Sequence, residues 1–438
     1  MSRRFTSAPG PLRGTIRVPG DKSISHRAVL FAAMSEGTSQ LTGVLDSADV
    51  NSTVEAVRAL GATVVRTGVS VAGLELRVTG WGNAGPRQPA GPIDCGNSGT
   101  TCRLLMGVLA GWPVSVTLTG DASLRRRPMR RVTDPLELMG AHFETRDGRL
   151  PITMSGGGLR GIAYVSPVAS AQVKTAVLLA GLRAEGATSV VEPALSRDHT
   201  ELMLPAFGIP IVCEPTGPSC GVAGPVTPVA TDVDVPGDPS SAAFLAGAAA
   251  LVPGSAVALT DVALNPTRLG FVEVMRRMGA HIDTAPTHAI GAEMVGTVTV
   301  RHAPQLTATV VTAGEVPSLI DEIPLLAVVA CAAYGVTRFE GVGELRVKET
   351  DRLASIVEQL TRLGGQAHSG ENWLEVDGPV SFNGAEVASF GDHRLAMAWA
   401  VAALTASGPV VIDDFEAVAV SYPNFAEDLA ALLESTVR

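Results

Sequence analysis

The apolar positions of this chain recur in one pattern: a helical stretch, a glycine, and then the alternation typical of a strand. The pattern occurs five times, as VEAVRALGATVV, LELMGAHFE, ELMLPAFGIPIV, VEVMRRMGAHID and IVEQLTRLGGQAH. The glycines are Gly61, Gly140, Gly208, Gly279 and Gly364. Each is predicted to end its helix in the left-handed conformation, which glycine adopts without a steric penalty.

The spacing of these glycines divides the chain into repeated units. The intervals are 79, 68, 71 and 85 residues, so about six units of roughly 70 residues fit the chain. Such units are too long for a solenoid and predict compact α/β subdomains, three to a domain. The segment 233–254 also resembles 16–37, since both contain a strand, Pro-Gly-Asp, a turn with serines and a helix of small residues. A duplicated domain with boundaries near residues 19 and 237 accounts for this likeness.

Hydrophobic residues make up 46% of the chain, which is enough for more than one buried core. The longest apolar runs, 242–252 and 325–334, are shorter than the roughly 18 residues that span a membrane. We interpret both runs as core helices. The N-terminal sequence MSRRFTSAPG shows no apolar secretion signal after its arginines, so we expect a cytoplasmic protein.

Charge and cysteine content argue against several classes of protein. The net charge of −10 argues against nucleic acid or an anionic membrane as the main partner. The five cysteines, at positions 95, 102, 213, 220 and 331, form no CxxC motif and no zinc-type pairing with histidine. We therefore expect free thiols and no metal.

Lysine is rare: the 33 basic residues are 30 arginines and three lysines, Lys22, Lys174 and Lys348. An ammonium group can shift its pKa and pass on a proton, whereas guanidinium is a permanently charged fork, so a chemical site cannot exchange the two freely. Lys22 and Lys348 lie in the polar motifs GDKSISHR and RVKETDR, before predicted helices. Lys174 lies in the apolar run VKTAVLLAGL, where survival by chance is an equally good explanation.

Five predicted helix starts carry groups that bind anions. They are GDKSISHR (20–27), DCGNSGTTCRLL (94–105), SAQVKTAVLLAGL (170–182), RVKETDRLASIVEQL (346–360) and FGDHRLAMAWA (390–400). Backbone N–H groups and the helix dipole favour an anion at such a start. The segment SLRRRPMRR (123–131) indicates either a funnel for a small anion or an exposed arginine-rich loop. A nucleotide-binding phosphate loop is excluded, because the required GK[ST] is absent.

In their order along the chain these motifs resemble the 5-enolpyruvylshikimate-3-phosphate synthases. The resemblance rests on GDKSISHR, GNSGTTCR, RRRPM, SAQVK, SRDHTE, PGDPSSAAF, IDEIP, RVKETDR and GDHRLAMA, and it covers essentially the whole chain. SAQVK, SRDHTE, PGDPSSAAF and IDEIP look closer to the bacterial subgroup known for glyphosate-tolerant members. The resemblance implies a two-domain α/β enolpyruvyl transferase fold, an inside-out barrel with three βαβαββ-like subdomains in each domain. The domains would be 19–237, on the shikimate 3-phosphate side, and 1–18 with 238–438.

The resemblance also implies the reaction. The enolpyruvyl group of phosphoenolpyruvate would pass to the 5-hydroxyl of shikimate 3-phosphate, in the shikimate pathway to chorismate and the aromatic amino acids, without a cofactor. Shikimate 3-phosphate would be bound by Lys22, Ser23, Arg27, Ser170, Ala171, Gln172, Arg197, Asp321 and Lys348. Phosphoenolpyruvate would be bound by Lys22, Gly99, Arg127, Gln172, Arg352 and Arg394. A cage of Arg and Lys would offset the repulsion between the two anions.

Proton transfers are needed as well as binding. The 5-hydroxyl must lose a proton as it attacks C2 of the enol ether, while C3 gains one. Asp321 is the candidate base, and Glu349 is the candidate acid at C3, with Lys22 assisting. His393 is a further candidate for a proton shuttle, with a structural role at the helix cap as the alternative.

Two positions depart from what relatives carry, and a third bears on a competing assignment. Many relatives have a lysine where this chain has Val420, which removes one expected cation for phosphoenolpyruvate, and Glu344 replaces a polar amide. UDP-N-acetylglucosamine enolpyruvyl transferase is the competing assignment, but that family usually has a cysteine where this chain has Ala122. A noncatalytic anion-binding scaffold is the alternative from another class, and the pair Lys348–Glu349 argues against it.

Gly99 bears on inhibition, because tolerant members of the similar subgroup carry alanine there. Glyphosate is longer than phosphoenolpyruvate, so a methyl group at this turn would obstruct the inhibitor more than the substrate. This chain has glycine there, so we expect glyphosate to inhibit the enzyme. Separately, we expect a monomer. If Gly99 only supplies a positive φ, alanine would instead perturb both ligands alike.

Overall fold

The chain folds as two units built on the same plan. The computed structural model describes residues 1–214 and 217–434. The N-terminal unit comprises Gly20–Val235 and Ala289–Glu293, and the C-terminal unit comprises Met1–Pro19, Pro236–His288 and Met294–Arg438. The boundaries expected from the sequence, near 19 and 237, differ from this division by one or two residues, and the segment Ala289–Glu293 was not expected.

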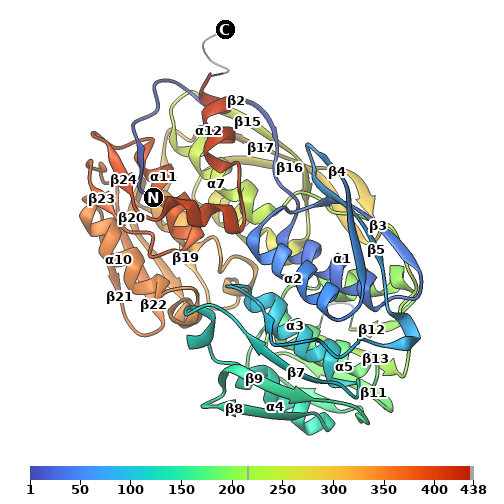
Figure 1. Cartoon of the computed structure of the whole chain (residues 1–438). Coiled ribbons are helices and arrows are strands. Elements are labelled where there is room, and N and C mark those ends of the chain that lie inside the picture. The colour runs from blue at the N-terminus through green and yellow to red at the C-terminus, as the bar shows by residue number, and fades with distance from the viewer. Residues whose placement is uncertain (215–216, 435–438) are drawn as a thin grey trace. The chain divides into compact units, whose positions relative to one another are not determined.

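Six helices and three open sheets form the described part of the N-terminal unit (Figure 1). The helices are α1 (Lys22–Met34), α2 (Ala48–Ala59), α3 (Gly99–Ala110), α4 (Arg130–Met139), α5 (Ala171–Gly181) and α6 (His199–Met203). The first sheet orders β14 (Val233–Asp234), β3 (Thr38–Val44), β5 (Gly73–Thr79) and β4 (Thr63–Ser70). The second orders β6 (Ile93–Asp94), β7 (Ser115–Thr119), β9 (Arg149–Ser155) and β8 (His142–Arg146). The third orders β10 (Ala163–Val165), β11 (Gly186–Val191), β13 (Ser219–Gly224) and β12 (Ile211–Cys213).

The C-terminal unit repeats this arrangement within its described residues. Its helices are α7 (Pro239–Leu251), α8 (Gly270–Arg277), α9 (Ile323–Ala330), α10 (Arg352–Arg362), α11 (His393–Ala403) and α12 (Phe425–Glu434). One sheet orders β16 (His281–Ile290), β17 (Glu293–Arg301), β15 (Ala256–Ala263) and β2 (Arg13–Arg17). The next orders β18 (Leu306–Thr307), β20 (Ala333–Glu340), β22 (Trp373–Gly378) and β21 (Gln366–Ser369), with β19 (Val310–Val311) also on β20. The last orders β1 (Arg3–Phe5), β24 (Val410–Ile412) and β23 (Glu386–Val387).

The connectivity of the second and third sheets of the N-terminal unit explains the repeat seen in the sequence. In the second sheet the order along the chain is β6, α3, β7, α4, β8, β9, in which β6 pairs parallel to β7 and the other pairs are antiparallel. A parallel pair requires a crossover, and α3 supplies it. The third sheet has the same order and pairing with α5 as its crossover. This βαβαββ order confirms the expected fold class.

In each unit three helices are enclosed by the rest of the unit. In α7 every residue from Pro239 to Ala250 is buried, and in α11 every residue is buried. Helices that are apolar or small on all sides have no polar face to turn to water, so they occupy the interior. In α10, by contrast, Glu358 and Arg362 are exposed while Leu353, Ile356 and Leu360 are buried. Of the open sheets described, none closes into a barrel, and the interior is helical.

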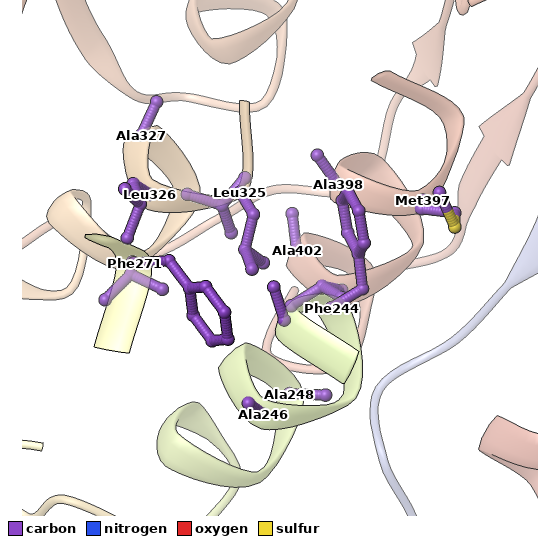
Figure 2. Packing of buried hydrophobic residues seen from close by; sticks show 14 of the residues in the cluster. Phe244, Ala246, Ala248, Phe271, Leu325, Leu326, Ala327, Met397, Ala398 and Ala402 are labelled. Atoms are coloured by element: carbon purple, nitrogen blue, oxygen red, sulfur yellow. The ribbon is translucent and has the colours of Figure 1, made fainter. Parts of the chain in front are cut away.

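Small residues let the enclosed helices approach closely. A Cβ added at Gly107 of α3 would lie 2.3 Å from the backbone oxygen of Ala176 in α5. A Cβ added at Gly247 of α7 would lie 2.6 Å from the side chain of Leu325 in α9. Figure 2 shows the C-terminal core, where Phe244, Leu325 and Ala398, one residue from each of α7, α9 and α11, lie together. Fully burying a side chain such as Phe244 contributes about 1.5–3 kcal/mol.

The five repeated glycines adopt the predicted left-handed backbone. Gly140 and Gly208 are the C-cap residues of α4 and of the 3₁₀ turn Leu204–Phe207, with φ of 113° and 76°. Gly61, Gly279 and Gly364 follow the C-cap residue of their helices, with φ of 103°, 97° and 88°. These helix ends are confirmed.

One of the two predicted core helices is wrong in part. The run 242–252 lies in α7, as expected. The run 325–334 divides, because α9 ends at Ala330 and Ala333 begins β20. A short apolar run can be helix or strand, and here it continues to the exposed Tyr334, so hydrophobicity alone did not mark where the helix ends.

Candidate functional site

Lys22 begins α1 in the N-terminal unit, as the sequence predicts. Asp21 caps the helix, its side chain accepting a hydrogen bond from the N–H of Ile24 at 2.8 Å. Nζ of Lys22 lies 3.2 Å from Oδ2 of Asp49, which lies in the first turn of α2. Both side chains are largely buried, so this lysine is held by a carboxylate at a helix N-terminus, where an anion is also favoured. Sequence reasoning missed Asp49.

Arg27 has a more internal position than the sequence suggested. The residue is 3% exposed, and its Nε donates to Oγ1 of Thr200 at 2.8 Å. One Nη donates to Oγ1 of Thr175 at 2.9 Å, and the other to the backbone oxygen of Ser23 at 3.0 Å. Arg27 therefore ties α1 to α5 and α6, while Ser23 lies in the first turn of α1.

A buried chain of hydrogen bonds, from one imidazole through three hydroxyl groups, joins α1, α2 and α3. Nδ1 of His26 lies 2.7 Å from Oγ1 of Thr53, which lies 2.6 Å from Oγ1 of Thr101. Thr101 donates to Oγ of Ser98 at 2.7 Å, and Ser98 caps α3. Burial, followed by the nearby charges of Lys22 and Arg27, holds the pKa of His26 well below its ordinary value. The imidazole is therefore neutral at pH 7 and serves as a hydrogen-bonding partner.

Two guanidinium groups lie against Gly99, the first residue of α3. A Cβ added there would lie 2.9 Å from one Nη of Arg103 and 3.4 Å from one Nη of Arg127. The φ of Gly99 is not positive; within this turn the left-handed residue is Gly96, with φ of 57°. Gly99 therefore gives room to two cations and does not serve as a positive-φ hinge.

Gln172 and Arg127 are oriented by partners in the GNSGTTCR motif. Oε1 of Gln172 accepts from Arg103 at 2.5 Å, and its Nε2 donates to Oγ1 of Thr100 at 2.9 Å. Arg127 donates to Oδ1 of Asn97 at 2.6 Å. Arg103 and Asn97 were not among the predicted site residues, although both lie in a motif singled out from the sequence.

Ser170, Ala171 and Arg197 complete the N-terminal cluster, which we define as Lys22, Ser23, Arg27, Gly99, Arg127, Ser170, Ala171, Gln172 and Arg197. Ser170 is the N-cap residue of α5, and the helix begins at Ala171. The backbone N–H of Ser170 donates to Oε1 of Glu192 at 2.7 Å. Arg197 is half-buried and follows Ser196, whose hydroxyl also donates to Glu192, at 2.7 Å.

In the C-terminal unit Arg352 is the centre of a group of carboxylates. The residue is 1% exposed, and its nitrogens lie 2.7 Å from Asp392, 2.7 Å from Glu349 and 3.1 Å from Asp321. Burial opposes the charge of this guanidinium, but the three carboxylates outweigh that effect and raise the pKa of Arg352 above its ordinary value. Nζ of Lys348 lies 3.3 Å from Oδ1 of Asp321. Asp321, the candidate base, therefore lies between the cations of Lys348 and Arg352.

Arg394 completes the C-terminal cluster, which we define as Asp321, Lys348, Glu349, Arg352 and Arg394. It is 3% exposed in the first turn of α11, and Asp392 caps that helix. Among the described residues, its Nε and one Nη have no hydrogen-bond partner, and its Cζ lies 5.8 Å from the ring centroid of Phe244. A buried cation with unused donors is a ready site for an anion, because leaving these donors unpaired carries a desolvation cost. His393, at the first position of α11, is buried.

The remaining sequence candidates lie elsewhere. Val420 ends the 3₁₀ turn Phe415–Val420, and Glu344 is exposed in the 3₁₀ turn Gly343–Val347. Lys174 is buried between two carboxylates. Within residues 1–214 and 217–434 no group of three or more His, Cys, Asp or Glu side chains is placed to hold a metal ion. Nor does any helix in those ranges have the length and apolar character to cross a membrane.

Comparison with known proteins identifies the family. The profile of the family described as EPSP synthase (3-phosphoshikimate 1-carboxyvinyltransferase) matches residues 6–429. A 3-phosphoshikimate 1-carboxyvinyltransferase of Anaeromyxobacter sp. (strain K) is 50% identical over 434 residues, which cover 97% of this chain and 96% of the relative. The protein of that name from Bacillus thuringiensis subsp. konkukian (strain 97-27) is 45% identical over 423 residues, covering 96% and 97%.

Solved structures show the same relationship. An EPSP synthase structure from Acinetobacter baumannii has a TM-score of 0.85 and 40% identity, and the match covers 98% of both chains. The enolpyruvyl transferase NikO from Streptomyces tendae has a TM-score of 0.78 at 20% identity over 98% of this chain and 97% of NikO, which shows a shared fold. From the family profile and the closely similar relatives we conclude that the chain belongs to the EPSP synthase family.

Proposed function

We propose that this protein transfers the enolpyruvyl group of phosphoenolpyruvate to the 5-hydroxyl of shikimate 3-phosphate, releasing phosphate. The observation that carries the proposal is 50% identity, over nearly the whole chain, to a relative named for that activity. The two clusters support it, because each places cations at helix N-termini and one adds carboxylates beside them. Aromatic amino acid biosynthesis is the corresponding pathway.

Shikimate 3-phosphate binding is assigned to Lys22, Ser23, Arg27, Ser170, Ala171, Gln172, Arg197, Asp321 and Lys348. The start of α1 supports this, because its N–H groups and the Lys22 ammonium suit a phosphate group. Arg27 contributes indirectly, because its guanidinium group donates to the hydroxyls of Thr175 and Thr200.

Phosphoenolpyruvate binding is assigned to Lys22, Gly99, Arg127, Gln172, Arg352 and Arg394. The room that Gly99 leaves beside Arg127 and the unused donors of Arg394 support it. Phosphoenolpyruvate carries a carboxylate and a phosphate, and planar guanidinium groups match both. The assigned residues include four cations, and no fifth comes from position 420, which is Val420 in this chain.

The proton transfers follow from the carboxylates. Asp321 accepts the proton of the 5-hydroxyl as that oxygen bonds to C2, and Lys348 and Arg352 stabilise its anionic form until then. Glu349 donates a proton to C3. The contact with Arg352 disfavours the protonated form of Glu349. Phosphoenolpyruvate bound at Arg352 competes for that guanidinium and adds negative charge beside Glu349. Both effects favour protonation of Glu349. The tetrahedral ketal then loses a proton from C3 and expels phosphate.

The competing assignment is UDP-N-acetylglucosamine enolpyruvyl transferase, and the family match does not favour it. A phosphate-release assay with phosphoenolpyruvate and either acceptor tests the proposal. We expect release with shikimate 3-phosphate, while release only with UDP-N-acetylglucosamine would refute the proposal. Inhibition by glyphosate, kinship with the tolerant subgroup, a monomeric state and a cytoplasmic location stay predictions from the sequence.

A further inference from the structure

Lys174, the third lysine, lies in a setting unlike that of Lys22 or Lys348. It extends from α5, and its side chain is 2% exposed. Nζ lies 2.9 Å from Oε2 of Glu192 and 2.7 Å from Oε1 of Glu201. Glu192 comes directly after β11, and Glu201 lies in α6. The ammonium therefore joins three separate segments of the N-terminal unit.

Glu192 also holds two segments of the N-terminal cluster. Its Oε1 accepts the backbone N–H of Ser170 at 2.7 Å, and its Oε2 accepts the hydroxyl of Ser196 at 2.7 Å. Ser170 begins the SAQVK motif, and Ser196 directly precedes Arg197. A single buried carboxylate thus fixes the backbone of one candidate ligand and the residue next to another.

Glu201 is tied in at a neighbouring point. Oγ1 of Thr175 lies 2.6 Å from Oγ1 of Thr200, so the residues that follow Lys174 and precede Glu201 are also in contact. Arg27 donates to both hydroxyls. The ion pair and the hydroxyl contact together hold α6 against α5, and Arg27 depends on both helices for its position.

The charge balance shows why a cation is needed between these glutamates. Glu192 is 3% exposed and its side chain is fully buried, as is nearly all of Glu201. Burial opposes the charge of Lys174, but Glu201 and Glu192 outweigh that effect and raise the pKa of Lys174, which is therefore charged at pH 7. Without this cation two buried carboxylates would repel each other and move toward water. Ser170 and Ser196 would lose their common partner.

We propose that Lys174 is a positioning residue for shikimate 3-phosphate. Acting through Glu192, it fixes the backbone at Ser170 and the segment that carries Arg197, while touching no substrate itself. The inference rests on the proposed function, because it takes Ser170 and Arg197 as ligands of that substrate. It gives a role to Lys174, whose presence in the sequence could equally be explained by chance.

The test is Lys174→Met in the full-length protein, since methionine keeps much of the side-chain volume without the charge. We expect shikimate 3-phosphate to bind about ten- to a hundredfold more weakly, which is roughly the loss from one weakened hydrogen bond to a charged group. The KM for phosphoenolpyruvate and the kcat at saturating shikimate 3-phosphate should change little. Calorimetry gives the dissociation constant of shikimate 3-phosphate, and steady-state kinetics gives the other two values.

Leu41→Ala is the matched control. Leu41 is 1% exposed on β3 of the same unit, so its truncation lowers the melting temperature without removing a charge beside Ser170. The control should keep its affinity for shikimate 3-phosphate. If Lys174→Met also keeps the wild-type dissociation constant, or if both variants lose affinity in proportion to their melting temperatures, the positioning role is overturned.

A second variant decides the matter if Lys174→Met does not fold. Ser196→Ala removes only the hydroxyl that binds Glu192, and we expect it to weaken shikimate 3-phosphate binding while leaving phosphoenolpyruvate unaffected. Unchanged affinity would contradict the inference. A wild-type protein that releases no phosphate from the two substrates would refute the proposed function instead, so the two failures are distinguishable.

Discussion

Gly99 offers the sharpest single-residue test, through the change Gly99→Ala. The added methyl group would lie 2.9 Å from one Nη of Arg103 and 3.4 Å from one Nη of Arg127. Both contacts are with the ends of flexible side chains, so the guanidinium of Arg103 can move aside. It cannot do so freely, because Gln172 holds it at 2.5 Å. The cost therefore falls on the space beside Arg127, which phosphoenolpyruvate and glyphosate are proposed to share.

The expected effect on stability is small. Gly99 has an ordinary helical backbone, where replacing glycine by alanine contributes about 0.4–1 kcal/mol to stability. The contact with Arg103 offsets part of this, so the free energy of unfolding should stay within about 1 kcal/mol of the wild type. For the inhibitor, an extra methyl group in a filled space costs about 1–3 kcal/mol, or roughly five- to 150-fold in its inhibition constant. The shorter substrate should lose much less.

Steady-state phosphate release at saturating shikimate 3-phosphate measures both effects. We expect wild-type activity to be inhibited by glyphosate, and Gly99→Ala to raise the inhibition constant far more than the KM for phosphoenolpyruvate. Gly96→Ala is the matched control, since Gly96 has φ of 57° and its replacement strains the backbone. It should impair stability and both ligands alike. If Gly99→Ala also weakens inhibitor and substrate equally, the steric reasoning is refuted.

The remaining predictions concern charged groups. Lys22→Arg keeps the charge but enlarges the group beside Asp49, so turnover should fall about a hundredfold or more with an unchanged circular dichroism spectrum; near-normal turnover would remove its assigned role. Asp321→Asn and Glu349→Gln should each lower single-turnover rates by about 10² to 10⁴ while calorimetry still detects shikimate 3-phosphate binding; lost affinity with normal chemistry would contradict the assignment. Arg352→Met should lower the free energy of unfolding by about 3–5 kcal/mol in denaturant titrations, because it removes the cation beside the buried Asp392, whereas Arg338→Met, at a pair that is only partly buried, should have far less effect. Equal effects would show that the Arg352 cluster is not held by charge.

Local signals in the sequence located the helix starts well. α1, α3, α5, α10 and α11 all begin within the five motifs that were singled out, and Asp21, Ser98, Asp351 and Asp392 cap four of them through their side chains. These signals are local, because a capping side chain and the N–H that it accepts from are a few residues apart. The left-handed glycines were predictable for the same reason.

The partners of the site residues could not be predicted in this way. Arg352 binds Asp392, which is 40 residues away along the chain, and Arg27 binds Thr175 and Thr200, which are 148 and 173 residues away. Such pairs depend on which helix ends the sheets bring together, and no residue near Arg352 in sequence reveals that choice. The end of α9 inside the apolar run 325–334 was missed because the residues that follow the helix are also apolar, although Tyr334 is exposed.

Lys174 shows most clearly that the sequence does not predict the partners of a buried residue. Its neighbours in sequence are apolar, and nothing in VKTAVLLAGL identifies Glu192 and Glu201 as its partners. Only the parallel pairing of β10 with β11 and the return of the chain into α6 bring those glutamates to α5. The rarity of lysine drew attention to the residue, and the fold shows that it is paired with two buried glutamates.

The central claim is the reaction itself, and nuclear magnetic resonance of the reaction mixture tests it most directly. Purified protein is mixed with phosphoenolpyruvate and shikimate 3-phosphate, and phosphorus and proton spectra are followed with time. The account predicts that phosphoenolpyruvate is consumed, inorganic phosphate appears in equal amount, and a new enol ether with two vinyl protons forms on a product that retains the 3-phosphate. Unchanged shikimate 3-phosphate, or phosphate released together with free pyruvate, would contradict it.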